Sequence, residues 1–122
     1  MTKNSIFNIK RIFSAWRNSM AGLHDAFTTQ AAFRQDLILC AVAAVVAAFI
    51  PVGATARAIM WASLILIPIA ELINTAIEAT IDRIGPEIHP LSTTAKDIGS
   101  AIVLLTIVAV AVLWILLIVA AL

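Results

Sequence analysis

The sequence carries little charge: of its 122 residues, 12% are Asp, Glu, Lys or Arg, and 62% are hydrophobic. A soluble domain carries about a quarter charged residues, so this composition indicates a chain that folds in a lipid bilayer. With a single cysteine, Cys40, the chain forms no internal disulfide bond. The net charge of +1 gives no reason to expect a nucleic-acid partner.

Glycine is also sparse. The four glycines, Gly22, Gly53, Gly85 and Gly99, are scattered, and the sequence contains neither a Walker motif nor a glycine-rich loop. Any bound nucleotide would therefore be held by side chains and a metal ion, because no backbone segment of this kind is available to cradle its phosphates.

Long apolar runs are present instead. Leu37–Val52 and Ala58–Ala70 reach the length of a membrane span only with flanking polar residues, whereas Ala101–Leu122 suffices alone, since a span needs ~20 residues. The first run is not a cleaved signal peptide, because the basic segment before it, about 36 residues, is too long. We predict one all-α membrane domain over residues 1–122. It should have an amphipathic surface helix at about 5–29 and spans at about 31–51, 55–83 and 91–121.

Basic residues flank these runs unevenly, and Lys and Arg accumulate on the cytoplasmic side of a membrane. The link around Pro51 holds Arg57 alone, and the C-terminus holds no Lys or Arg. We therefore expect the N-terminus and the 83–97 loop in the cytoplasm and the C-terminus outside. The residues that decide this are Lys3, Lys10, Arg11, Arg17 and Arg34 before the first run, and Arg83 and Lys96 between the second and third.

The N-terminal segment 6–27 has apolar residues at steps of three and four, with basic residues on the other side. This pattern is typical of a helix that lies in the membrane interface. Such a helix can serve as an anchor alone, or Arg11 and Arg17 can also bind phosphate. Composition leaves both readings open.

The segment ELINTAIEATID places Glu71, Asn74, Glu78 and Asp82 on one stripe of a helix, roughly 16 Å long. A carboxylate that faces lipid is costly, so the stripe must face protein or a water-filled cavity. One subunit of three spans is too thin to enclose it, and an oligomer is expected. Either these side chains specify helix packing, or one carboxylate binds a divalent cation while the other acts as a general base.

Pro68, just before this stripe, deprives the carbonyl of Leu64 of its helical hydrogen bond, and we expect it to shape the helix there. After the stripe, Gly85, Pro86 and Pro90 predict a turn. The turn returns Lys96 and Asp97 to the membrane level of Glu78 and Asp82. Carboxylates, an amide and cations at one level are the inventory that phosphoryl transfer requires.

Three motifs point to a known family: QAAFRQD at 30–36, ELINTAIEATIDRIG at 71–85 and AKDIGSA at 95–101. With the chain length and the three spans, they resemble the prokaryotic integral-membrane diacylglycerol kinases over essentially the whole chain. The resemblance implies a homotrimer in the bacterial inner membrane. Its members use Mg²⁺ and transfer the γ-phosphate of ATP to diacylglycerol, giving phosphatidate.

The resemblance also implies roles for individual residues. Glu71 would be the general base, and Glu78 and Gln30 would bind the metal. The nucleotide site would comprise Arg11, Asn18, Gln30, Asn74, Glu78, Asp82, Glu87, His89, Lys96 and Asp97. The lipid substrate would be contacted by Arg11, Arg34, Gln35, Arg57, Glu71 and Ser100.

The sequence departs from the family pattern at three positions. Gln30 replaces a Glu that shares metal binding in the family, and an amide oxygen ligates Mg²⁺ without a negative charge. We expect a weaker metal site or an altered metal requirement, which Asp36 could offset in part. Asn18 stands where the family often has an aromatic residue, and Pro68 is unusual.

Three other functions stay open at this point. A related kinase of the same family would phosphorylate undecaprenol. A small oligomeric proton-coupled transporter would use Glu71 or Glu78 as a proton relay, but such exporters commonly have four spans. A non-catalytic assembly protein would not require the Lys96–Asp97 pair.

Overall fold

The computed structural model describes Ile6 and residues 8–122; residues 1–5 and 7 lie outside the described part. Lys3, on which the predicted orientation partly rests, and the predicted start of the surface helix at Ser5 fall outside it. In the described part, every regular element is a helix, which confirms the all-α prediction. The helices are α1 (Ile9–Thr29), α2 (Ala31–Phe49), α3 (Ala54–Leu64), α4 (Leu66–Ile84) and α5 (Pro90–Ala121).

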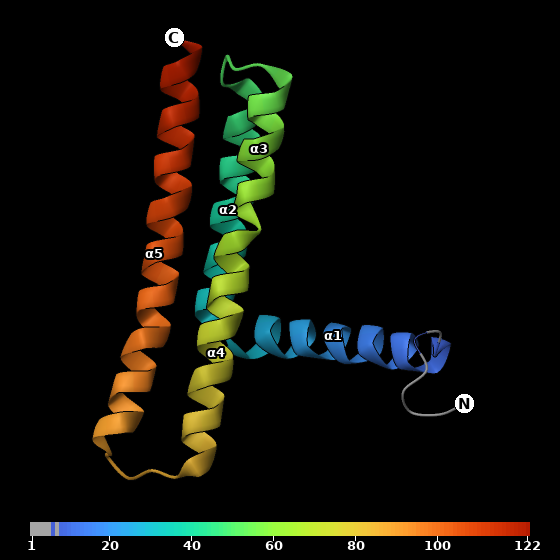
Figure 1. Cartoon of the computed structure of the whole chain (residues 1–122), viewed down its shortest axis with the longest axis vertical. Helices are drawn as coiled ribbons and strands as arrows, with labels where there is room; N and C mark the ends of the chain where they lie inside the picture. Colours follow the sequence, from blue (N-terminus) through green and yellow to red (C-terminus); the bar gives the residue numbers. More distant parts are fainter. Residues whose placement is uncertain (1–5, 7) are drawn as a thin grey trace.

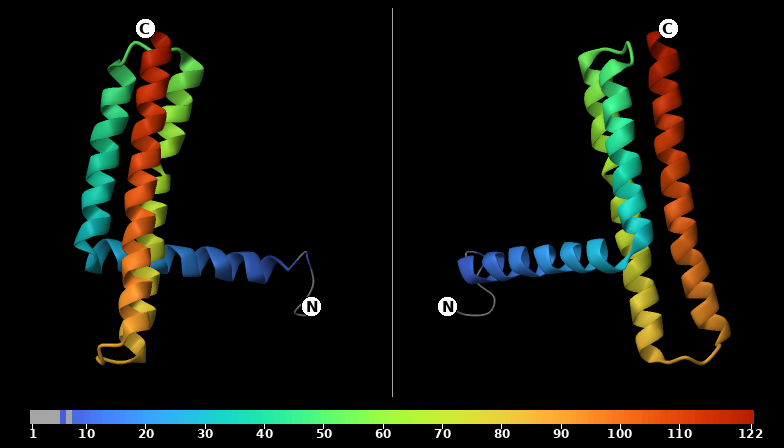
Figure 2. Two further views of the ribbon diagram at one scale, coloured as in Figure 1. Left: turned by 60° about the vertical axis from the view of Figure 1, so that its left-hand side comes forward. Right: turned by 180° about the vertical axis from the view of Figure 1, so that it is seen from behind.

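Among the described residues, three stretches are long and apolar enough to cross a membrane, as the sequence predicts: Ala31–Phe49, Ala54–Ile84 and Pro90–Ala121. They run side by side, and α5 packs mainly along α4 (Figures 1 and 2). The α2–α3 turn and the C-terminus lie at one end of this bundle, the turn end. The α4–α5 connection lies at the other, the loop end.

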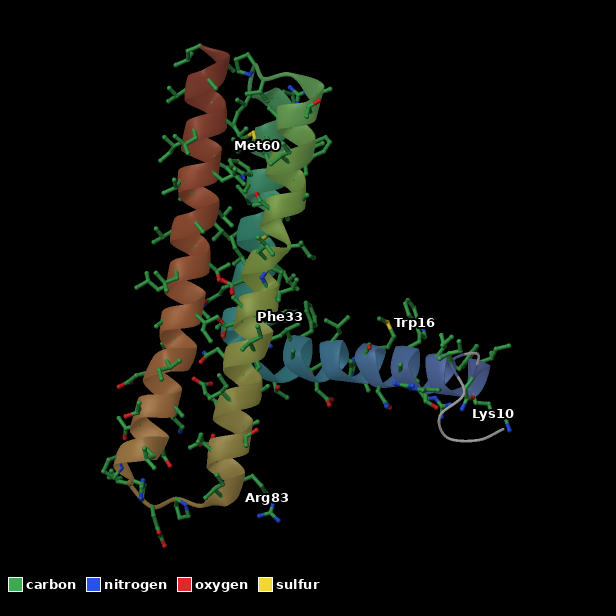
Figure 3. The ribbon with its side chains drawn as sticks, in the orientation of Figure 1. Lys10, Trp16, Phe33, Met60 and Arg83 are labelled. Carbon is green, nitrogen blue, oxygen red and sulfur yellow. The ribbon has the colours of Figure 1, made fainter. Side chains whose placement is uncertain are left out.

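Helix α1 lies crosswise to the bundle (Figures 1 and 2). Trp16 points toward the turn end and Lys10 toward the loop end (Figure 3). The Asn8 side chain caps the helix by accepting a hydrogen bond from the Arg11 N–H at 3.3 Å. The apolar side of α1 is exposed in the isolated chain, with Phe13 at 68% and Trp16 at 65%. An apolar side of this kind, facing the turn end, fits a helix embedded in the surface of a membrane whose interior lies toward that end.

The second membrane stretch is interrupted at Ile65, where α3 ends and α4 begins. Pro68 explains the break, because it cannot donate to the carbonyl of Leu64. The thiol of Cys40 on α2 donates to that carbonyl at 3.4 Å. A side chain from the neighbouring helix thus compensates for the hydrogen bond that the proline removes.

The core lies toward the turn end, where Ala47 and Met60 are completely buried. Two polar side chains join the helices there. The indole N–H of Trp114 on α5 donates to Ser63 Oγ at 2.9 Å, and Ser63 Oγ donates to the Met60 carbonyl at 2.7 Å. The indole of Trp114 and the hydroxyl of Ser63 each have an acceptor. These two hydrogen bonds therefore fix α5 against α3 and leave neither donor unpaired.

Candidate active site

The crossing of α1 and α4 sets the depth of the polar stripe. A groove of about 620 Å³ runs between them, lined on α4 by Leu72, Thr75, Ala76 and Ala79. If α1 lies in the interface, this level marks the membrane surface. Glu71 then lies on the membrane side, and Glu78 and Asp82 lie on the aqueous side. From Ser100 onward α5 extends for ~33 Å, close to the ~30 Å hydrocarbon thickness of a bilayer.

Exposure changes steadily along the stripe. Glu71 and Asn74 are each only 8% exposed, Glu78 is half-buried and Asp82 is exposed. Asn74 packs against Gly99 of α5, and Asp82 binds Lys96 of α5. The predicted stripe therefore faces protein, as the cost of placing a carboxylate in lipid requires.

Asn74 connects the buried and half-buried parts of the stripe. Its Nδ2 donates to Glu78 Oε1 across 3.4 Å, at the long end of the hydrogen-bonding range. Its Oδ1 is buried and has no hydrogen-bond partner among the described residues. Asn74 thus holds the Glu78 carboxylate from one side and leaves the rest of that carboxylate available to a ligand.

An ion pair closes the stripe toward the loop end. Lys96 Nζ lies 2.8 Å from Asp82 Oδ1, and both side chains are well exposed, at 42% and 68%. Exposed ion pairs contribute little to stability because water screens them, so a phosphate group can replace Asp82 as the partner of Lys96 at little cost. Asp97, the next residue, is exposed.

The α4–α5 connection forms a small pocket of about 190 Å³ beside this ion pair, and Glu87 and His89 line it together with Asp82 and Lys96. His89 Nδ1 accepts a hydrogen bond from the Leu91 N–H at 3.1 Å and so caps α5. Gly85 ends α4 with φ 158°, a conformation accessible mainly to glycine. The connection therefore keeps four of the predicted nucleotide-site residues close together.

The α1–α2 junction supplies a second polar group. Gln30, which lines the α1–α4 groove, donates through Nε2 to Thr29 Oγ1 at 3.2 Å. Arg34 Nη1 donates to the Phe27 carbonyl at 2.7 Å and so fixes the angle between the helices. Gln35 is exposed. Asp36 Oδ2 is buried without a partner among the described residues.

Other predicted site residues are not brought to the stripe within one chain. Arg11 and Asn18 are exposed on α1, whose N-terminal part projects away from the bundle (Figure 3). Arg57 lies at the turn end, where its guanidinium donates to the carbonyls of Ala47, Ile50 and Val52 at 3.0, 2.8 and 3.3 Å. Ser100 is exposed on α5, next to Gly99.

The candidate metal ligands are of types that Mg²⁺ takes, but they do not line one pocket: Gln30 lines the α1–α4 groove, and Glu78 does not. Among residues 8–122, no three His, Cys, Asp or Glu side chains form a cluster that could hold a metal alone. Mg²⁺ commonly takes one or two carboxylates, together with phosphate oxygens and water. Glu78 supplies such a carboxylate, and Gln30 offers an amide oxygen.

Sequence reasoning missed one feature of the site: it did not single out Gly99, which is buried against Asn74. A glycine inside a helical pattern often marks close packing, and that signal was present in AKDIGSA.

Comparison with known proteins gives a consistent result. The sequence profile described as prokaryotic diacylglycerol kinase matches residues 17–118. The chain is 41% identical over 111 residues to the diacylglycerol kinase of Escherichia coli, covering 91% of each chain. It is 45% identical over 106 residues to that of Pseudomonas aeruginosa, covering 87% of this chain and 86% of the relative. It is 33% identical over 106 residues to that of Haemophilus influenzae, covering 87% and 90%. The chain therefore belongs to the prokaryotic diacylglycerol kinase family.

Proposed function

We propose that this protein is a lipid kinase that transfers the γ-phosphate of ATP to the primary hydroxyl of diacylglycerol, giving phosphatidate and ADP. One observation carries the proposal. A single stripe of α4 runs from the buried Glu71 to the exposed Asp82–Lys96 ion pair, across the level at which α1 crosses the bundle. A lipid alcohol and a water-soluble nucleotide can meet only at such a boundary.

On the membrane side, Glu71 acts as the general base. It accepts the proton of the lipid hydroxyl as the alcohol oxygen attacks the γ-phosphorus. The new oxygen–phosphorus bond forms while the bond to the β–γ bridging oxygen breaks, and ADP leaves. The surroundings of Glu71 exclude water, since only 8% of this residue is exposed. Hydrolysis of ATP therefore does not compete with transfer to the lipid.

On the aqueous side, Glu78 and Gln30 would hold Mg²⁺, with Asn74 orienting Glu78. When bound, Mg²⁺ neutralises charge on the β- and γ-phosphates. Lys96 leaves Asp82 for the phosphate oxygens and stabilises the charge that develops in the transition state. Asp97, Glu87 and His89 complete the nucleotide site around the α4–α5 connection.

A homotrimer accounts for the residues that one chain leaves apart. Arg11 and Asn18 are carried on the projecting part of α1, from which they can reach the stripe of a neighbouring subunit. Arg34, Gln35 and Ser100 would contact the lipid on its way to Glu71, and Arg57 would contact it nearer the turn end. The loop end then faces the cytoplasm, which supplies ATP, and the C-terminus lies outside the inner membrane.

The test is lipid-dependent consumption of ATP by the purified protein in detergent micelles with Mg²⁺. We expect radiolabelled phosphate to appear in phosphatidate when diacylglycerol is added, and to a much smaller extent in undecaprenyl phosphate when undecaprenol is added. The reverse preference would assign the protein to undecaprenol. No transfer to either lipid, with proton flux in vesicles, would favour a transporter.

A mixed-trimer experiment tests the shared site. Trimers of inactive Glu71→Gln and inactive Lys96→Ala chains should regain part of the activity if neighbouring subunits contribute to one site. Mixtures that stay inactive would show that each chain forms a complete site.

A further inference from the structure

Gly99 occupies the point at which α4 and α5 approach each other beside the stripe, and it is buried. A methyl group at this position would overlap Asn74 Oδ1. It would also lie 3.4 Å from Asn74 Cγ and 3.6 Å from Ile77 Cδ1. All three nearest atoms belong to side chains, and the two closest belong to Asn74. The conflict is therefore with one side chain and not with the backbone of α4.

The other glycines behave differently. A methyl group at Gly22, Gly53 or Gly85 would meet no atom within 4 Å. Gly99 is thus the glycine whose missing side chain leaves space for a neighbouring residue, and the amide oxygen of Asn74 fills that space.

The placement of that oxygen has a consequence for Glu78. The Asn74 side-chain amide is planar, so the position of Oδ1 fixes that of Nδ2, which donates to Glu78 Oε1 at 3.4 Å. Oδ1 itself has no partner among the described residues. Burial of an unpaired acceptor is unfavourable, and packing alone would be better served by an apolar side chain. An amide at this position is explained if Asn74 Nδ2 must be held beside the Glu78 carboxylate.

We propose that Gly99 is a positioning residue for the metal–nucleotide site. By having no side chain, it lets α5 seat the Asn74 amide, which in turn holds the Glu78 carboxylate in place for Mg²⁺. This inference rests on the proposed kinase function and adds to it a residue that touches neither substrate nor metal.

The first experiment compares Gly99→Ala with Gly53→Ala. Gly53 precedes α3 at the turn end with φ −66° and ψ 165°, a conformation that alanine adopts without strain. For Gly99→Ala we expect kcat to fall about tenfold or more and the half-saturating Mg²⁺ concentration to rise about fivefold, with KM for the lipid within about twofold of wild type. Gly53→Ala should match the wild type in all three. Unchanged Mg²⁺ dependence in Gly99→Ala would overturn the proposal.

The second experiment is a double-mutant cycle read by binding. Calorimetry measures the Mg²⁺-dependent affinity for a non-hydrolysable ATP analogue in micelles, with thermal unfolding as a parallel measurement. Asn74→Ala removes both atoms that Gly99→Ala would displace. In that background, Gly99→Ala should change the affinity less than about twofold, whereas in the wild-type background it should weaken binding about fivefold. Equal losses of affinity and of thermal stability in both backgrounds would reduce Gly99 to a packing residue and overturn the proposal.

These outcomes separate the two proposals. Phosphorylation of diacylglycerol by the wild type, with additive effects in the cycle, rejects the role of Gly99 and leaves the kinase function intact. Nucleotide binding that shows the expected coupling, without transfer to any lipid alcohol, supports the role of Gly99 and rejects the kinase function.

Discussion

The two ends of the bundle treat polar groups in opposite ways. Toward the turn end, Trp114 and Arg57 donate to acceptors in neighbouring segments, and Ser63 donates to the Met60 carbonyl of its own helix. Toward the loop end, Asn74 Oδ1 and Asp36 Oδ2 are buried without partners among the described residues, and Glu71 is buried as well. Both ends carry polar side chains among apolar helices, yet the two buried polar atoms without partners both lie toward the loop end.

This difference indicates that polar groups at the turn end serve stability and that those at the loop end serve function. Fully satisfied polar groups fix helices against each other, because their hydrogen bonds offset the cost of desolvation. Unsatisfied groups reduce stability, so they persist where a ligand supplies the missing partner. Substitutions at the turn end should therefore change the free energy of unfolding, and substitutions at the loop end should change kinetic constants.

The largest effect is expected at the loop end, from Glu71→Gln. The amide keeps the size of the side chain but cannot accept a proton, so kcat should fall by about 10²–10⁴ while nucleotide affinity stays near the wild-type value. Steady-state kinetics and nucleotide binding in micelles give both values. A collapse in nucleotide affinity with turnover retained would instead exchange the roles of Glu71 and Glu78.

Arg57→Met should give the opposite signature at the turn end. Methionine keeps much of the aliphatic stem but removes the guanidinium that donates to the carbonyls of Ala47, Ile50 and Val52. This loss should lower the free energy of unfolding by about 1–3 kcal/mol. Unfolding in mixed micelles measures the change. Arg83→Met, in the last turn of α4 where the side chain is exposed, is the matched control. Unchanged stability together with a raised KM for the lipid would place Arg57 in the lipid path alone.

The departure at Gln30 allows a finer test of the loop end. Gln30→Glu adds a negative charge beside the α1–α4 groove, and the half-saturating Mg²⁺ concentration should fall several-fold, about 1 kcal/mol in metal affinity. Thr28→Glu adds the same charge two residues away, on a side chain that bonds only to the backbone of its own helix. The measurement is the rate of phosphate transfer as a function of Mg²⁺ concentration, compared between the two variants and the wild type. If both variants respond alike, the charge acts at long range and Gln30 is not a ligand.

The sequence predicted the elements of this fold well, because hydrophobic runs and helical spacing act locally. The stripe from Glu71 to Asp82 and the break at Pro68 followed from residue order alone. Contacts between helices did not follow in the same way. That Asn74 meets Gly99, or that Cys40 reaches Leu64, depends on the rotation of α4 against α5 and of α2 against α3. Side-chain packing fixes such rotations, and a single sequence does not reveal them.

The smallest expected effect tests whether the turn end owes its stability to satisfied polar groups. Cys40→Ala removes the donor to the Leu64 carbonyl, which Pro68 leaves without a helical partner, and should cost about 1 kcal/mol. The substitution also removes a sulfur atom from the packing, so this loss alone does not prove the point. Pro68→Ala returns an N–H to the helix, which can then bond the Leu64 carbonyl. In that background the packing loss of Cys40→Ala remains and the hydrogen-bond loss disappears. The difference between the two backgrounds therefore isolates the hydrogen bond, and a difference near zero would mean that the thiol contributes by packing alone.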